Sequence, residues 1–183
     1  ICSLVKRNHF IVSLIKELLL EEGRQILILS DRISHLEELD NLLEKEEITS
    51  KGFYIGKMKQ KDLDVSATKN VLLATYSMAS EALDIPSLNT LVMVTSRRNI
   101  EQSVGRILRR PDSKIQPTII DFNDKIPCFQ SQGEFRKKYY LKKGYEVITY
   151  DMNNNKIISE TEENQLSTNV TENVSNEELD FVD

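Results

Sequence analysis

Short runs that are apolar at nearly every position recur along this chain and constrain its fold more than any other feature. The clearest lie at 25–29, 70–75 and 90–95. Because these runs do not alternate between apolar and polar residues, they are typical of parallel strands with both faces covered. Between them lie segments with the apolar spacing of helices, at 8–22, 33–43 and 100–110. This alternation predicts an α/β fold, with a parallel sheet and helices on both of its faces.

Further elements follow from apolar spacing and from the Gly and Pro residues between segments. We expect short strands at 53–55, 118–122 and 145–150, and a basic helix at 129–143. Asn8 is expected to cap the first helix. The basic stretch 136–143 has two interpretations. It is either the exposed face of its helix, which we favour, or a clamp for a strand of nucleic acid.

Charge is divided unevenly along the chain. Residues 151–183 contain nine acidic residues and one lysine, whereas residues 1–150 contain 23 Lys and Arg against 20 Asp and Glu. The C-terminal stretch is also rich in Asn, Ser, Thr and Glu, a composition typical of disorder. We therefore predict one folded domain over 1–150 and an acidic, disordered tail over 151–183.

Several classes of protein are disfavoured by what the sequence lacks. No apolar run is long enough to span a bilayer, and the first residues show no signal-peptide pattern. Cys2 and Cys128 have no metal-ligand spacing and form no disulfide framework. His9 and His35 have no partner pattern, so we expect both at the surface and no metal site. These features indicate a soluble, intracellular protein without a membrane partner.

Basic and amide side chains share one face of the predicted helix 100–110. Arg106 and Arg109 are three residues apart, and Gln102 precedes Arg106 by four. Gly105 leaves room for a ligand or another backbone to approach. Because guanidinium groups offer a rigid donor fork to phosphate oxygens, this face can hold an anion. The alternative is an ordinary solvated basic face.

Three segments match the motifs of one enzyme family in order and spacing. The pattern Gln102-x-x-Gly105-Arg106-x-x-Arg109 resembles motif VI of superfamily 2 helicases. Residues 71–75 with 81–86 resemble motif V, and residues 26–32 resemble motif IV. The resemblance covers about residues 5–150. It implies a RecA-like fold and the second of the two motor domains of such a helicase.

Motif V departs from the common form at two points. Ala82 stands where the family usually has Gly, and Glu81 stands where it usually has Arg. The segment between Thr75 and Glu81 is also about one residue longer than in the common RNA-helicase form. These departures resemble the branch found in phages and large DNA viruses.

The resemblance implies an ATP site shared with the N-terminal RecA-like domain of the same protein. Arg106 and Arg109 match arginine fingers, which stabilise charge on the transferred phosphoryl group. Gln102 matches a residue that hydrogen-bonds near the γ-phosphate. The chain has no phosphate loop and no strand-following Asp-Glu pair. ATP with Mg²⁺ would therefore be held mainly by the other domain, and we expect this chain alone to be inactive.

Further positions carry nucleotide and nucleic-acid roles by the same resemblance. Asp84 matches an acid that binds the ribose or adjoining groups, although an Asp before Ile-Pro is also a common turn former. Glu81 and Gly105 join it as expected nucleotide contacts. Ser30, Thr75 and Ser77 match residues that touch the phosphates of DNA or RNA, with helix capping as their alternative role. Three lysines at 57, 59 and 61 lie on a solvated loop or contact phosphates.

These assignments favour an ATP-dependent nucleic-acid helicase or translocase. Two alternatives stay open at this point. One is a nucleotide-sensing or binding module that has lost turnover, and the other is the motor subunit of a translocase that does not unwind.

Overall fold

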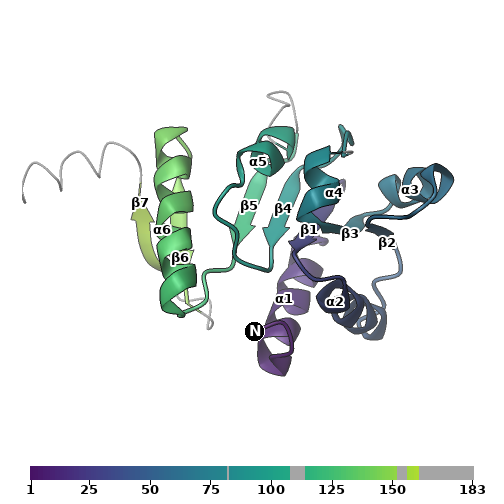
Figure 1. The fold of residues 1–183 in the computed structure, drawn as a ribbon, viewed down its shortest axis with the longest axis horizontal. Helices are drawn as coiled ribbons and strands as arrows, with labels where there is room; N and C mark the ends of the chain where they lie inside the picture. The colour runs from purple at the N-terminus through teal and green to yellow at the C-terminus, as the bar shows by residue number, and fades with distance from the viewer. Residues whose placement is uncertain (82, 108–113, 152–155, 161–183) are drawn as a thin grey trace, which may run out of the picture. The chain divides into compact units, whose positions relative to one another are not determined.

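Helices and strands alternate along the chain, as the sequence predicts. The computed structural model describes residues 1–81, 83–107, 114–151 and 156–160 (Figure 1). The helices are α1 (Val5–Leu18), α2 (Ile33–Lys45), α3 (Gln60–Ala67), α4 (Tyr76–Glu81), α5 (Glu101–Ile107) and α6 (Pro127–Lys142). The strands are β1 (Ile26–Ser30), β2 (Lys51–Tyr54), β3 (Val71–Thr75), β4 (Thr90–Met93), β5 (Thr118–Asp121), β6 (Val147–Tyr150) and β7 (Lys156–Glu160). In these described segments no helix has the length and apolar character needed to cross a membrane.

Five of the strands form a parallel sheet in the order β2-β3-β1-β4-β5 (Figure 1). Ser30 at the end of β1 pairs with Thr75 at the end of β3. Met93 at the end of β4 pairs with Leu29 on one side and Asp121 on the other. All five strands therefore end at the same side of the sheet, which we call the carboxyl edge. The predicted parallel sheet is confirmed.

Both faces of this sheet are covered, which explains why its central strands are apolar at nearly every position. Ile26 and Ile28 of β1 belong to a buried cluster with residues of α1 and α2. Leu27 and Leu29 are equally buried but point to the opposite face, because side chains alternate along a strand. On that face α4 and α5 contact the central strands.

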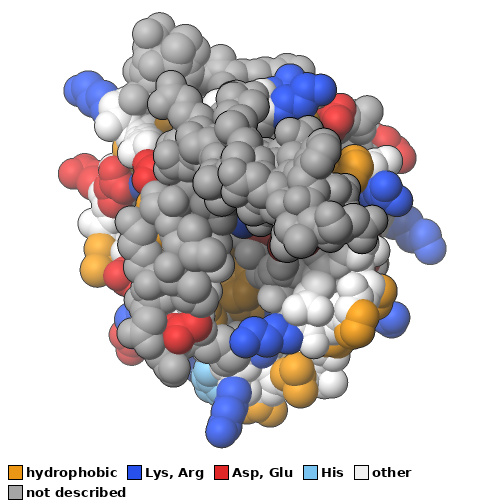
Figure 2. Space-filling view, turned by 90° about the vertical axis from the view of Figure 1, so that its left-hand side faces the viewer, with side chains coloured by type: hydrophobic (Ala, Val, Ile, Leu, Met, Phe, Trp, Pro, Cys, Tyr) orange, Lys and Arg blue, Asp and Glu red, His pale blue; other side chains and the backbone are white. Residues whose placement is uncertain are grey.

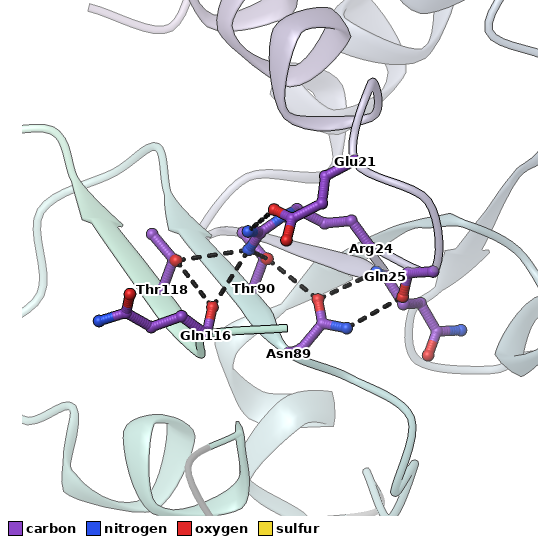
Figure 3. Close-up of polar contacts among 8 residues, drawn as sticks. Glu21, Arg24, Gln25, Asn89, Thr90, Gln116 and Thr118 are labelled. Atoms are coloured by element: carbon purple, nitrogen blue, oxygen red, sulfur yellow. Dashed lines mark hydrogen bonds and ion pairs between the residues drawn. The ribbon is translucent and has the colours of Figure 1, made fainter. Parts of the chain in front are cut away.

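A buried arginine lies at the opposite side of the sheet, the amino edge, where the strands begin. Arg24 precedes β1 and pairs with the Glu21 carboxylate (Figure 3). Its Nη1 donates to the hydroxyl of Thr90 at 2.7 Å and to that of Thr118 at 3.3 Å. Thr90 begins β4 and Thr118 begins β5. One guanidinium therefore joins the starts of three neighbouring strands.

Asn89 extends this network on the other side of Thr90. Its Oδ1 accepts hydrogen bonds from the Gln25 backbone N–H and the Thr90 hydroxyl, each at 3.1 Å. Its Nδ2 donates to the Gly23 carbonyl at 3.0 Å (Figure 3). These side chains satisfy one another, so most of the polar groups buried at the amino edge are paired, whereas Gln25 Oε1 is buried without a hydrogen-bond partner.

Two predictions about the first helices are wrong. Asn8 does not cap a helix but lies inside α1, which starts at Val5 and has Leu4 at its N-cap position. His35 is not at the surface, since only 1% of it is exposed. Asn8 and His35 bond to each other, because α1 and α2 lie side by side on the sheet. His9 is exposed, as expected.

The chain divides into two compact units, Ile1–Gln130 and Ser131–Asp183. The second unit contains most of α6 and an antiparallel hairpin in which β6 pairs with β7. The sequence predicted no strand in residues 151–183, whereas β7 lies within this stretch. In the basic stretch 136–143, Arg136 is buried, whereas Lys138, Lys142 and Lys143 are exposed. The favoured interpretation as an exposed helix face therefore holds for these lysines but not for the arginine.

Candidate functional site

The expected nucleic-acid contacts Thr75 and Ser77 lie together at the carboxyl edge. Thr75 ends β3, and Ser77 follows in the first turn of α4. Their hydroxyl oxygens are 3.2 Å apart. Ser77 is exposed and Thr75 is partly exposed. Two adjacent hydroxyls that reach solvent can donate to a phosphate backbone without reading bases.

Charged and aromatic residues link the loops that follow β1, β3 and β4. The Asp31 carboxylate accepts from Arg97 Nη1 at 3.2 Å, and the Asp31 backbone N–H donates to the Thr95 hydroxyl at 2.9 Å. The Arg97 guanidinium lies 5.0 Å from the centre of the Tyr76 ring. The Tyr76 hydroxyl donates to the Thr95 carbonyl at 2.7 Å. These four residues were not predicted as site residues, although each directly follows or lies close after a strand end.

Ser30 occupies the end of β1, as expected, but its side chain is buried. Its Oγ accepts from the Arg32 backbone N–H at 3.2 Å and lies 3.3 Å from His35 Nδ1. None of Ser30 is exposed to solvent. In this conformation its hydroxyl shapes the loop from inside rather than facing a ligand.

His35 is held neutral by its surroundings. Burial, together with the nearby positive charge of Arg7, lowers the pKa of His35 to about 4. Glu38 and Asp124 act in the opposite direction but do not offset the burial. At neutral pH the imidazole therefore has one N–H donor and one nitrogen acceptor.

Arg7 ties α1 to the loop that follows β5. Its Nε and Nη2 donate to the two oxygens of Asp124 at 2.7 and 2.9 Å. Nη2 also donates to the Val94 carbonyl at 2.8 Å, and the guanidinium lies 5.3 Å from the centre of the Phe122 ring. Sequence reasoning missed this pair because 117 positions separate its members. The pair fixes the loops after β4 and β5 against α1.

The motif VI residues lie on α5 or follow it in the sequence, and α5 comes after β4 in the chain. Gly105 is exposed, and a Cβ added there would meet nothing within 4 Å. This surface is therefore open to an approaching group. Gln102 and Arg106 belong to α5, but their side chains lie outside the described residues, as does the whole of Arg109.

The two expected acidic contacts lie at the end of α4 and just after it. Glu81 is its last residue, and Asp84 precedes a turn in which the Leu88 N–H donates to the Ile85 carbonyl at 3.2 Å. Both carboxylates are exposed. Ala82, between them, lies outside the described residues. Their nucleotide-binding role stays a prediction.

Lysines follow β2 at the same carboxyl edge. Lys57 and Lys59 are exposed in the loop before α3, and Lys61 is exposed within α3. Lys57 has a backbone φ of 69°, in the left-handed region. Basic and acidic side chains are both visible in Figure 2, and neither sign forms one continuous patch there. On the face shown there, charge alone therefore does not mark a nucleic-acid surface. No group of three or more possible metal ligands occurs among the described residues.

Comparisons with known proteins agree with this arrangement. The family model "Helicase conserved C-terminal domain" matches residues 9–110. A protein of Acanthamoeba polyphaga mimivirus, whose name assigns it provisionally to the ATP-dependent RNA helicases, is 41% identical over 148 residues. That match covers 79% of this chain and 28% of the viral protein. The chain thus spans little more than a quarter of that relative.

Solved structures share the fold at low sequence identity. T4 UvsW superposes with a TM-score of 0.62 at 21% identity, covering 79% of this chain and 34% of that protein. The C-terminal domain of the DEAD-box protein Dbp5 gives 0.59 at 16% identity, covering 73% of this chain and 78% of that domain. The sheet with its helices is therefore the RecA-like fold predicted from the motifs. The chain belongs to the helicase conserved C-terminal domain family.

Proposed function

We propose that this chain is the second motor domain of an ATP-dependent helicase or translocase that acts on nucleic acid. The observation that carries this proposal is the position of motifs IV, V and VI. Motif IV includes β1, motif V includes β3 and motif VI comes after β4 in the chain, and these three strands are neighbours in the sheet. Ligands of open α/β sheets bind outside the carboxyl ends of the strands.

The nucleotide would lie between this domain and a first RecA-like domain. ATP, bound with Mg²⁺ mainly by that first domain, supplies the free energy for movement. The exposed Gly105, with no neighbour within 4 Å of an added Cβ, fits a helix surface that a phosphate group approaches. From this helix we assign Arg106 and Arg109 to the stabilisation of phosphoryl charge and Gln102 to a hydrogen bond near it. Asp84 and Glu81 are assigned to the nucleoside side of the site.

The nucleic acid would contact the carboxyl edge through its sugar-phosphate backbone. Thr75 and Ser77 supply hydroxyl donors, and the exposed lysines at 57 and 59 supply charge. Contacts of this kind position a strand without reading its sequence. The mimivirus relative is named as an RNA helicase, so RNA is the first ligand to test, with DNA of the same sequence beside it.

The test is steady-state ATP hydrolysis by a polypeptide that joins this chain to a first motor domain. Replacing Arg106 or Arg109 by Ala should lower turnover by a factor on the order of 10³, with a much smaller change in the KM for ATP. Lys should restore little, because a point charge does not reproduce the guanidinium fork. The double variant Thr75→Ala/Ser77→Ala should instead raise the RNA concentration needed for stimulation by roughly three- to tenfold.

Thr149→Ala is the matched control, since it removes an exposed hydroxyl from the other unit. It should change neither the turnover nor the RNA concentration needed for stimulation. Wild-type turnover in both arginine variants would end the finger assignment. RNA stimulation that is unchanged in the double hydroxyl variant would remove Thr75 and Ser77 from the nucleic-acid surface.

A further inference from the structure

A chain of buried polar side chains runs from the start of α1 to the end of β1. Asn8 Nδ2 donates to the Cys2 carbonyl at 2.7 Å, and Asn8 Oδ1 lies 3.0 Å from His35 Nε2. His35 Nδ1 lies 3.3 Å from Ser30 Oγ, which accepts from the Arg32 N–H at 3.2 Å. Asn8, His35 and Ser30 are each at most 1% exposed. None of them can exchange its partner for bulk water.

The direction of every hydrogen bond in this chain is fixed by the first one. Because the Asn8 amide nitrogen donates to Cys2, its oxygen faces His35 and must accept. His35 Nε2 therefore carries the ring proton, and Nδ1 is the acceptor. The Ser30 hydroxyl can then donate to Nδ1 while its lone pair receives the Arg32 N–H. One tautomer of His35 thus sets the orientation of the Ser30 hydroxyl.

The loop held in this way belongs to the candidate site. Ser30 and Arg32 flank Asp31, whose backbone N–H bonds to Thr95 and whose carboxylate pairs with Arg97. A change in the Ser30 hydroxyl would move the Asp31 amide and carboxylate together. His35 itself is buried and cannot touch a ligand.

We propose that neutral His35 is a positioning residue, which holds the Ser30 hydroxyl and so sets the 30–32 loop against Thr95 and Arg97. The functional part of this inference rests on the proposed nucleic-acid surface at the carboxyl edge. Several charged groups surround the imidazole. They are Arg7 of α1, the amino group of Ile1, Glu38 of α2, and Asp124 of the loop after β5. The positive groups favour the neutral ring and the negative groups oppose it.

The first experiment uses long-range ¹H–¹⁵N spectra of the 183-residue chain, with His9→Gln to assign the two histidines. His35 should give the pattern of the Nε2–H tautomer at pH 7 and keep it down to pH 5.5. An Nδ1–H tautomer, or an imidazolium at pH 6.5, would overturn the proposal.

The second experiment separates the two ends of the imidazole. His35→Asn places an amide oxygen near the position of Nδ1, so it can keep the Ser30 bond while losing the Asn8 bond. His35→Gln places an amide near Nε2, so it can keep the Asn8 bond while losing the Ser30 bond. Both variants should melt earlier than the parent chain. His35→Gln should shift the Asp31 and Arg32 amide signals, and His35→Asn should largely restore them.

RNA-stimulated hydrolysis in the two-domain polypeptide gives the functional readout. His35→Gln should raise the RNA concentration needed for half stimulation by roughly three- to tenfold, with turnover at saturation little changed. His35→Asn should need an RNA concentration for half stimulation close to that of the parent polypeptide. Equal effects of Asn and Gln on the loop amides would reduce His35 to a structural role and overturn the proposal.

Two further outcomes stay decisive. If neither His35 variant folds, Ser30→Ala removes the hydrogen bond between Ser30 and His35 from the Ser30 side. It should then shift the amide signals of Asp31 and Arg32 as His35→Gln is expected to do. Unshifted amides in Ser30→Ala would overturn the proposal. If the parent polypeptide shows no RNA stimulation, the proposed function fails, whereas the tautomer and the amide shifts still decide the role of His35.

Discussion

The two edges of the sheet each contain an arginine paired with an acid, but the two pairs have opposite surroundings. At the amino edge, the Arg24 side chain is 7% exposed and also bonds to the hydroxyls of Thr90 and Thr118. At the carboxyl edge, the side chains of Arg97 and Asp31 are 43% and 46% exposed. A buried guanidinium with several partners holds strands together, whereas an exposed pair contributes little to stability. The same residue types therefore serve packing at one edge and form an exposed pair at the other.

The largest effect is expected from breaking the amino-edge network. Arg24→Ala would leave the hydroxyls of Thr90 and Thr118 without their buried donor. We expect the free energy of unfolding to fall by roughly 2–4 kcal/mol, measured by urea denaturation. Lys138→Ala removes an exposed basic side chain and serves as the control, with a change below about 0.5 kcal/mol. A loss as small as that of the control would show that the network does not join the strands.

The next effect concerns the pH dependence that His35 confers. Its pKa is lowered from 6.5 to about 4 in the folded chain, so the unfolded chain takes up the proton first as pH falls. The stability that neutral His35 contributes is complete above pH 6.5 and is lost as pH falls towards 4. The difference between the parent chain and His35→Asn should shrink by about 2–3 kcal/mol over this range.

Urea denaturation at several pH values between 7.5 and 4.5 measures this difference. Carboxylates titrate in the same way in both proteins, so the subtraction removes most of their contribution. A difference that stays constant with pH would mean that His35 has the same pKa in the folded and the unfolded chain. It would contradict a neutral imidazole in the folded chain below pH 6.5.

The smallest effect on stability, and the sharpest contrast with Arg24, is expected at the carboxyl edge. Arg97→Gln should change the free energy of unfolding by less than about 0.5 kcal/mol, because its pair with Asp31 is exposed. If Arg97 contacts a phosphate, the slope of log affinity against log salt for RNA should decrease by about 1. Anisotropy titrations with labelled single-stranded RNA measure this slope. An unchanged slope together with a large loss of stability would reverse the contrast between the two edges.

The sequence predicted well those elements that carry a long periodic signal. The continuous apolar runs of β1, β3 and β4 and the helical spacing of α1 and α2 were found because burial on two faces, or on one helix stripe, leaves a regular pattern. Helices α3 and α4 were missed because eight and six residues are too few to show such spacing. Strand β7 was missed because the apolar pair Ile157-Ile158 stands in a polar stretch.

The candidate site was predictable only in part. Motif residues placed Ser30, Thr75 and Ser77 correctly at the carboxyl edge, because parallel strands all end there. The burial of Ser30 could not be predicted, since it depends on His35 and, through it, on Asn8. A polar residue whose local sequence predicts a helix cap or a surface position becomes buried only when a distant segment packs over it. The local sequence contains no information about that packing.

The order of the strands also shapes how the chain must fold. β1 is the first strand in sequence, yet it lies at the centre of the sheet between β3 and β4. Its neighbours Val71 and Thr90 are 45 and 64 positions away from their partner Ile26. Pairing at such separation carries a large loop-closure cost and slows folding. A nascent chain would therefore expose the four consecutive apolar residues of β1 until β4 has emerged, which makes this segment prone to misassembly during synthesis.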